Sequence, residues 1–502
     1  MAVLHIVIAI AFAAWLIKRG LFKSSKLDVP HVQFEEHESI SRYISGYRSL
    51  MERGYTLYTK NGRPFSIRNP SDENRPLVIL PMKYLAEVRH APQNKLSFSD
   101  FLEKVVGGPE MNPEVTRMAR LSMNRSLDYM VQTLHEECLF AWTKVIPSCK
   151  DWTSIQPTPI LNELFARIAA RIMTGPELCR DEKWIQVVLS YTDATIKAIR
   201  GVRAKYHPSL RFLARYLDAN TRSVLKLRRT AANMLRPSLE FRMSEPTSNA
   251  REEGAKYNDA IKWLADVYRA RSKQFSADQL AQDEFILNVA SISSASATAL
   301  SIIYDLVEHP DVVEEIRAEI TKVKNEQGIW TRQSLGTLWL LDSFMKESMR
   351  LHTLQQLTVQ RTALVPWTFK DGFHLPTGTL ISFASQQLNL DDDIYPSAAS
   401  FDARRFLRKR QELDPNKFHF ASVSDDYITF GAGFHACPGR FLAQDILKLM
   451  LIQLISRYDF RLAGDNQKRP QDIAYNFSNM PDMATQIVLR EKASDRATEG
   501  PD

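Results

Sequence analysis

A single cysteine lies in a glycine-rich segment whose composition suits metal binding. Cys437 belongs to the run FGAGFHACPGR, which spans Phe430–Arg440. Gly431 and Gly433 allow positive φ angles and a close approach to a flat ligand, and Pro438 fixes φ without offering an N–H. The residues that follow predict a helix whose first N–H groups favour a thiolate over a thiol. Because zinc and iron–sulfur sites need several cysteines, the segment predicts one thiolate ligand to a planar metal macrocycle.

The other three cysteines do not extend this site. Cys138, Cys149 and Cys179 are widely spaced and match no zinc pattern. So few cysteines in a chain of 502 residues are typical of a reducing compartment such as the cytosol.

The run around Cys437 matches the pattern Phe-Gly-x-Gly-x-His-x-Cys-Pro-Gly-Arg at every fixed position. It resembles the haem-binding signature of the cytochrome P450 family. The resemblance implies a bound heme b (iron protoporphyrin IX) with Cys437 as the axial thiolate ligand, which donates electron density to the iron and favours O–O cleavage. It also implies that Gly431 and Gly433 border the cofactor. Phe430 would shield the sulfur, and His435 would lie near a haem propionate.

A second motif is an acidic and a basic residue three positions apart. Glu347 and Arg350 share a helix face in the run LLDSFMKESMRLH, and the apolar residues around them favour burial over a solvated salt bridge. The pair resembles the family's Glu-x-x-Arg motif. This resemblance implies that Arg405, in the segment Phe401–Phe406, completes a structural triad beneath the haem. The usual proline of that segment is Ala403 here.

Two further arginines resemble haem contacts. Arg361, in the run LTVQRTAL, resembles the family arginine that pairs with a propionate, for which the bidentate guanidinium is suited. An ordinary strand arginine is the alternative. The family's tryptophan and arginine pair of an early helix is not evident. Arg120 or Arg125 can supply its arginine, and the sequence does not choose between them.

The longest apolar segment, Asp283–Glu308, predicts a helix that ends before Pro310. In the family a long helix crosses the oxygen side of the haem and carries the motif Ala/Gly-Gly-x-Asp/Glu-Thr-Thr. The register set by the proline places this motif on residues 290–295. Ser293 then replaces the acid, and Ser294 replaces the first threonine and keeps a hydroxyl.

This departure matters because splitting dioxygen requires two protons at its distal oxygen. Ser294 can orient a water, but Ser293 supplies no acidic proton. Asp283 and Glu284 lie about two to three turns away, too far for direct relay. We expect water to bridge the gap so that hydroxylation proceeds. The alternative is ring expansion, rearrangement or dehydrogenation without net oxygen insertion.

The amino terminus predicts a membrane anchor. Residues Ala2–Ile17 are apolar except for His5, and Lys18 and Arg19 follow at once. A helix of this length reaches about 24 Å, slightly less than a bilayer core. Positive charge after the apolar run argues against a cleaved signal peptide and leaves the rest of the chain in the cytosol. We therefore expect a single-pass protein of the endoplasmic reticulum membrane.

Hydrophobic periodicity predicts a mostly α fold with a small β region. Apolar residues recur at helical spacing from Pro113 to Leu351, and a last helix is expected at Arg440–Arg457. Short apolar runs with turn residues predict strands within Tyr55–Leu80 and Leu364–Asp392. The resemblance implies the cytochrome P450 fold.

The expected organisation is a single catalytic domain with short flanking segments. Residues 1–19 form the anchor, 20–45 a linker, 46–492 the catalytic domain and 493–502 a polar, disordered tail.

The composition restricts the partners. A formal net charge of +7 suits docking to an acidic reductase, and the resemblance implies NADPH–cytochrome P450 reductase, with cytochrome b5 as an optional second electron donor. No basic run is interleaved with aromatic residues, so no nucleic-acid partner is expected. The cluster of Lys226, Arg228 and Arg229 is interpreted as a solvated helix face.

Two more segments indicate the subgroup. The runs GPELCRDEKW (Gly175–Trp184) and NDAIKWLADV (Asn258–Val267) are similar to fungal microsomal members that oxidise secondary metabolites. The resemblance implies an apolar small-molecule substrate with a terpenoid, indole-terpenoid or polyketide–peptide skeleton. It also makes Cys179 a structural cysteine.

Overall fold

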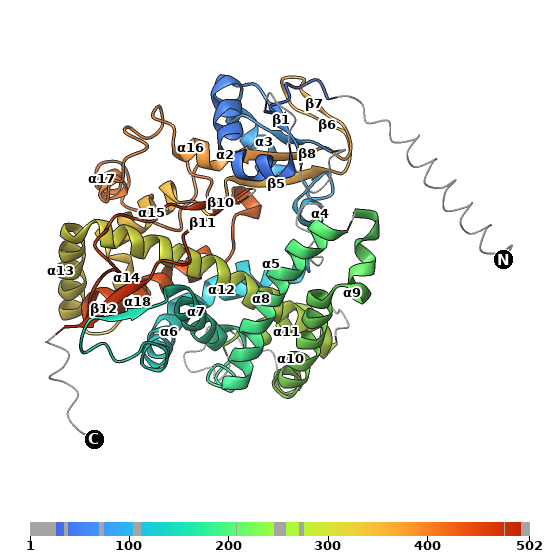
Figure 1. The fold of residues 1–502 in the computed structure, drawn as a ribbon. Helices are drawn as coiled ribbons and strands as arrows, with labels where there is room; N and C mark the ends of the chain where they lie inside the picture. The colour runs from blue at the N-terminus through green and yellow to red at the C-terminus, as the bar shows by residue number, and fades with distance from the viewer. Residues whose placement is uncertain are drawn as a thin grey trace.

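The computed structural model describes residues 27–34, 39–69, 75–103, 112–206, 208–244, 258–270, 276–475 and 477–492. The predicted anchor at 1–19 and the predicted tail at 493–502 lie outside these residues. Most of the described chain is helical, and the strands are short (Figure 1).

Long helices form the larger part of the molecule. They are α2 (Ile40–Leu57), α6 (Asn124–Val145), α7 (Pro157–Met173), α8 (Glu182–Lys205), α10 (Ala219–Ser244), α11 (Ala260–Ala270), α12 (Ala277–Glu308), α13 (Pro310–Gln327), α15 (Trp339–Leu351) and α18 (Arg440–Arg457). Shorter helical elements connect them: η1 (Thr59–Asn61), η2 (Met82–Tyr84), α3 (Leu85–His90), α4 (Phe98–Phe101), α5 (Pro113–Met118), η4 (Ala119–Met123), η5 (Pro208–Leu213), α9 (Ala214–Leu217), α14 (Arg332–Gly336), α16 (Ser385–Asn389), α17 (Arg405–Glu412) and η6 (Gly433–His435).

The largest sheet has the strand order β1-β2-β8-β5-β3 and lies beside α2 and α3 (Figure 1). Its strands are β1 (Phe65–Ile67), β2 (Leu77–Ile79), β3 (Leu96–Ser97), β5 (Leu357–Ala363) and β8 (Leu380–Ala384). Only β2 and β8 pair in parallel within it. A three-stranded sheet has the order β4 (Thr153–Ile155), β12 (Ile487–Glu491) and β9 (Tyr458–Leu462). Two further sheets have two strands each: β10 (Ile473–Tyr475) pairs with β11 (Ser478–Met480), and β6 (Trp367–Thr368) pairs with β7 (His374–Leu375).

Helix α12 runs through the middle of the helical part (Figure 1). It begins where the Ser276 hydroxyl accepts the N–H of Gln279, and Pro310 opens the next helix two residues after it ends. Of the described helices, α12 alone has the length and hydropathy of a membrane span. It packs against α7, α10 and α15, which is the environment of a core helix.

The helix predictions are confirmed for the strongly periodic segments. Helix α18 has the predicted bounds Arg440–Arg457, and α12 contains the predicted Asp283–Glu308 with two extra turns in front. The β-strand predictions are confirmed in part, because β5 begins at Leu357 and not at Leu364.

The predicted linker differs most from the structure. Helix α2 begins at Ile40, inside the stretch expected to be linker, because the Ser39 hydroxyl caps it by accepting the N–H of Arg42. The buried Tyr43 and Tyr47 face the core one turn apart. His31, further upstream, pairs with Ser66 of β1. The carboxyl-terminal part of the linker is therefore part of the folded domain.

Candidate active site

The cysteine segment, Phe430–Arg440, forms a tight loop that contains η6 and leads into α18. The backbone N–H of Cys437 donates to the carbonyl of Phe430 at 2.8 Å, which closes the loop. Gly431 and Gly433 have φ angles of 81° and 61°. A Cβ at Gly433 would lie 2.8 Å from the carbonyl oxygen of Arg89, so a side chain does not fit there. Both glycines therefore serve the loop as the sequence predicts.

Cys437 differs from the other cysteines in accessibility. Cys138, Cys149 and Cys179 are buried, whereas Cys437 is exposed at the surface of its loop. Burial among protein atoms nevertheless raises the pKa of the Cys437 thiol. The N–H groups of Gly439 and Arg440, and the Arg440 charge, act in the opposite direction. The helix start favours the thiolate, as predicted, but the effect of burial on the thiol pKa is larger, and a bound metal ion would stabilise the thiolate further.

Aromatic residues flank the loop on both sides. The ring of Phe430 packs edge-on against Phe420, with centroids 5.6 Å apart. His435 lies 6.3 Å from the ring of Phe98 and within hydrogen-bond distance of the Gln93 amide. Burial, followed by the charges of two arginines, lowers the pKa of His435 to about 4. The imidazole is therefore neutral in this environment.

The two arginines that act on His435 are Arg361 and Arg120. Arg361 is 1% exposed, and its Nε and Nη2 atoms have no hydrogen-bond partner. Burial lowers its pKa to about 10, and no acidic group among the described residues offsets this shift. Arg120 also has a buried Nη1 without a partner, and its guanidinium stacks on Phe434 at 3.8 Å. Arg125 is exposed. The structure thus brings Arg120, and not Arg125, to Arg361 and His435.

Buried donors without acceptors are uncommon in folded proteins and indicate a missing partner. The donors of Arg361 and Arg120 are cationic, so their partner should be anionic and placed beside His435. A flat, otherwise apolar group that carries two carboxylates and also reaches Cys437 would provide this anionic partner. The residues present therefore fit heme b.

The structure also brings the predicted triad together. Glu347, Arg350 and Arg405 are all buried. Glu347 accepts from Arg350 Nε and Nη2 at 2.9 and 2.7 Å, and from Arg405 Nε at 3.0 Å. The two guanidinium groups also donate to five backbone carbonyls, those of Asn389, Pro396, Ser397, Ala398 and Ser400. The triad therefore fixes the chain segment that precedes α17.

Helix α15 holds the following segment with residues that the sequence did not single out. Lys346 donates to the carbonyls of His419 and Ser422 at 2.9 and 3.0 Å and lies over the Tyr427 ring at 3.7 Å. Burial lowers its pKa to about 7. A lysine flanked by apolar residues such as Phe344, Met345 and Met349 was the available sequence signal, but its partners lie more than 70 residues away and could not be named.

The serines of α12 lie on the side of the helix that is open. The Ser294 side chain is exposed and its hydroxyl donates to the Ala290 carbonyl at 2.9 Å. Ser293 is half-buried. Asp283 is engaged elsewhere, because Tyr268 and Asn112 donate to its Oδ2 at 2.8 and 2.7 Å. Among the described residues, no carboxylate is hydrogen-bonded to either serine, in keeping with the replacement of the motif's acid by Ser293.

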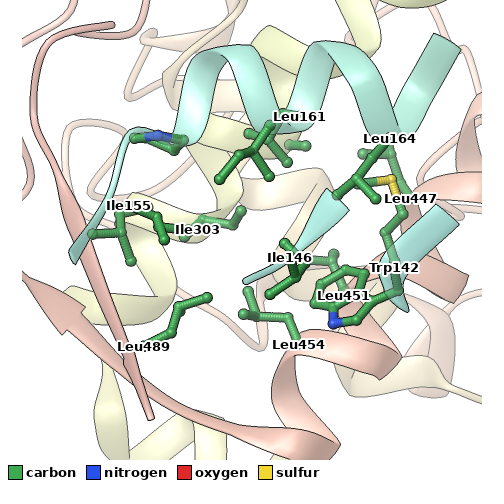
Figure 2. A pocket seen from close by; sticks show the side chains of 15 residues that line it. Trp142, Ile146, Ile155, Leu161, Leu164, Ile303, Leu447, Leu451, Leu454 and Leu489 are labelled. Carbon is green, nitrogen blue, oxygen red and sulfur yellow. The ribbon is translucent and has the colours of Figure 1, made fainter. Parts of the chain in front are cut away.

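A separate apolar cavity of about 40 Å³ lies between α6, α7, α12, α18 and β12 (Figure 2). Ala299 and Ile303 line it from α12, and Leu447 and Leu451 line it from α18. Its lining contains none of the predicted site residues, so it is not the haem site.

Comparison with known proteins agrees with this geometry. The sequence model described as "Cytochrome P450" matches residues 111–485, which is most of the chain. The chain therefore belongs to the cytochrome P450 family, whose members bind haem through an axial cysteine thiolate.

Named relatives specify the class as monooxygenases. Cytochrome P450 monooxygenase cheE of Chaetomium globosum is 35% identical, over 97% of each chain. Cytochrome P450 monooxygenase ccsG of Aspergillus clavatus is 33% identical, over 97% of this chain and 98% of the relative. Pyrichalasin C-7 hydroxylase of Pyricularia grisea is 35% identical, over 87% of each. The chain is thus a cytochrome P450 monooxygenase, similar to fungal enzymes of secondary metabolism.

A solved structure supports the fold alone. Retinoic acid-bound cyanobacterial CYP120A1 superimposes with a TM-score of 0.64, at 17% identity, over 88% of this chain and 94% of that one.

Proposed function

We propose that Cys437 is the axial ligand of heme b and that the protein oxidises an apolar secondary metabolite in a biosynthetic pathway, with O₂ and electrons from a reductase. The observation that carries this proposal is the convergence of an accessible thiol with the unpaired cationic donors of Arg361 and Arg120. Such a combination suits a macrocycle that presents a metal to sulfur and carboxylates to guanidinium groups.

When bound, haem supplies the redox chemistry with O₂, and the chain supplies position and protons. Arg361, Arg120 and the neutral His435 would hold the propionates. Phe430 covers the sulfur, and its carbonyl fixes the Cys437 backbone. The loop cannot shift freely, because the neighbouring segments are tied to α15 by the triad and by Lys346.

On the opposite side, the Ser294 hydroxyl would orient water where protons are consumed, and its exposure supports this role. Ser293 adds a second hydroxyl but no acid. Water-mediated proton delivery supports hydroxylation as the reaction. The lack of an acid at this position favours a second candidate function, namely ring expansion, rearrangement or dehydrogenation without net oxygen insertion. Product analysis under ¹⁸O₂ separates them, because only oxygen insertion labels the product.

Composition and the resemblance to fungal relatives support a proposal for the substrate, the partners and the location. A terpenoid, indole-terpenoid or polyketide–peptide skeleton is proposed as the substrate, and its identification requires the metabolite profile of a gene knockout. NADPH–cytochrome P450 reductase is the proposed electron donor, with cytochrome b5 as an optional second donor. The apolar run Ala2–Ile17, with Lys18 after it, supports an anchor in the endoplasmic reticulum membrane and a cytosolic catalytic domain.

The proposal predicts the spectrum of the reduced protein with carbon monoxide. The wild-type chain should show the strongly red-shifted band of a thiolate-ligated haem, and Cys437→Ala should lose both this band and all oxidation, because no other described cysteine lines the site. Cys179→Ala is the matched control and should keep the band. Retention of band and activity in Cys437→Ala would contradict the assignment.

A further inference from the structure

A continuous polar stripe runs along α12, which is otherwise strongly apolar in this region. Glu284, Asn288, Ser291 and Ser294 follow one another at spacings of four, three and three residues. Residues at these spacings are neighbours on a helix surface. The stripe therefore connects the hydroxyl on the open side of the helix with a carboxyl group about 15 Å away along the axis.

Glu284 is the unusual member of this stripe. Its side chain is fully buried, and neither carboxylate oxygen has a hydrogen-bond partner. The Asn288 side chain is also fully buried and its Oδ1 has no partner, although its Nδ2 donates to the Glu284 carbonyl at 2.8 Å. An unpaired buried carboxylate is strongly unfavourable, so Glu284 is held in its neutral form and carries a proton.

The groups around Glu284 reinforce this state. Burial raises its pKa well above the ordinary value, and the negative charges of Asp259 and Asp283 raise it further. Asp259 is paired with Arg242 of α10 at 2.9 Å, and Tyr268 of α11 donates to Asp283 at 2.8 Å. These basic and hydroxyl groups are therefore already engaged with the neighbouring acids.

The remaining members lead towards the open side of the helix. The Ser291 hydroxyl donates to the Asn288 carbonyl at 3.0 Å, and the exposed Ser294 hydroxyl donates to the Ala290 carbonyl. Each step along the stripe rises about 5 Å, which one water with two hydrogen bonds can span. Buried waters characteristically occupy sites with otherwise unsatisfied polar groups such as Glu284 and Asn288.

We propose that Glu284 is the proton donor for dioxygen cleavage, acting through waters held by Asn288 and Ser291 and through the Ser294 hydroxyl. This inference rests on the proposed function. Glu284 becomes a carboxylate as its proton enters the chain, Ser294 passes a proton to the oxygen atom that leaves as water, and solvent returns a proton to Glu284. Two electrons from the reductase and two protons thus convert one atom of O₂ to water, while the other enters the substrate.

The first test examines the proton itself. The infrared difference spectrum of the ferric holoenzyme, wild type minus Glu284→Gln, should contain the C=O band of a protonated carboxyl that shifts in D₂O. Wild type minus Asp278→Asn serves as the matched comparison, because Asp278 is an exposed acid of the same helix. If the Glu284 difference lacks a protonated-carboxyl band at neutral pH, the inference is wrong.

The second test follows dioxygen in protein reduced by the reductase with NADPH. Glu284→Gln should slow water formation by about 100-fold and raise the peroxide released per NADPH, because a positioned acid contributes about this factor. It should also alter the solvent isotope effect, and Glu284→Asp should recover part of the rate. Asp278→Asn, which changes an exposed acid of the same helix, should behave as wild type.

The outcomes separate this inference from the proposed function. A normal carbon monoxide band with unchanged peroxide release in Glu284→Gln overturns the proton role and leaves the haem assignment intact. An equal increase in peroxide in Asp278→Asn also overturns it, because loss of any acid of α12 would then give the effect. A missing band in the wild-type protein would overturn the proposed function itself.

Discussion

Individual side chains around the cysteine loop divide the work of holding a cofactor. The Cys437 sulfur is not the only attachment point. Burial raises the pKa of its thiol despite the nearby N–H groups, which disfavours the thiolate form that binds a metal. The unpaired donors of Arg361 and Arg120 add a second, purely electrostatic attachment. Attachment at two separate points fixes the orientation of a flat group as well as its position.

The choice between the two early arginines is testable by haem retention. Arg120→Gln removes one charge-assisted contact, which contributes about 1.5–3 kcal/mol, so the haem should bind at least about tenfold more weakly. The measurement is the ratio of haem to protein absorbance after gel filtration. Arg125→Gln is the matched control on the exposed neighbour and should retain haem as wild type does. Equal loss in both variants would refute the assignment of Arg120.

Lys346 predicts a pH dependence of stability. Its pKa in the folded protein is lowered to about 7 by burial, while the unfolded chain has the ordinary lysine value of about 10.4. Between these values the unfolded state binds more protons, so stability contributed by this residue rises with pH. The thermal midpoint of wild type, relative to Lys346→Met, should therefore increase from pH 7 to pH 9. A difference that is constant over this range would show that the lysine titrates normally.

Helix α15 is the element that organises the cysteine side of the molecule. Removal of the Glu347 charge leaves Arg350 and Arg405 buried without their shared carboxylate, which should cost about 3–5 kcal/mol. Glu347→Gln should accordingly lower the thermal midpoint and the haem content. Glu315→Gln, which breaks an exposed ion pair with Arg404, is the matched control and should cost no more than about 1 kcal/mol. Similar losses in the two variants would count against a structural role for the triad.

Elements with strong periodicity could be predicted from the sequence, and those set by distant contacts could not. Helix α12 has a regular apolar pattern and a proline that limits it, so its existence followed from local signals. The choice of Arg120 over Arg125 depended on the π-helical turn η4, Ala119–Met123, which alters the phase of the helix. A prediction from hydrophobic periodicity assumes a regular α-helix and therefore cannot anticipate that turn.

The same limit applied to the site residues. The loop around Cys437 and the pair of Glu347 and Arg350 are short motifs formed by residues close together in the chain. They could therefore be recognised from the sequence alone. Lys346 and the unpartnered Glu284 gain their meaning from burial, which depends on the packing of several helices. From the sequence, Glu284 was only an acid too distant from Ser294 for direct relay. That its carboxyl group is buried without a hydrogen-bond partner could be seen only in the structure.

The packing of the whole helical part leaves room for one stabilising change. The cavity of about 40 Å³ is lined by apolar residues, most of them from four helices and two strands (Figure 2). Ala299→Val would add two methyl groups there, and cavity filling of this kind commonly gains about 0.5–2 kcal/mol. Denaturant unfolding of the holoenzyme should show a higher midpoint, and Leu447→Ala should show a lower one by enlarging the same space. A lower midpoint for Ala299→Val would mean that the cavity is too rigid to accept the side chain.

The anchoring of chain segments by α15 has a practical consequence for redesign. Its buried side chains Lys346 and Arg350 donate to backbone carbonyls between Asn389 and Ser422. The folded state therefore depends on the length of the chain between these two residues. Insertions between Asn389 and Ser422 should be among the first changes that the protein rejects, because they would pull these carbonyls away from their donors.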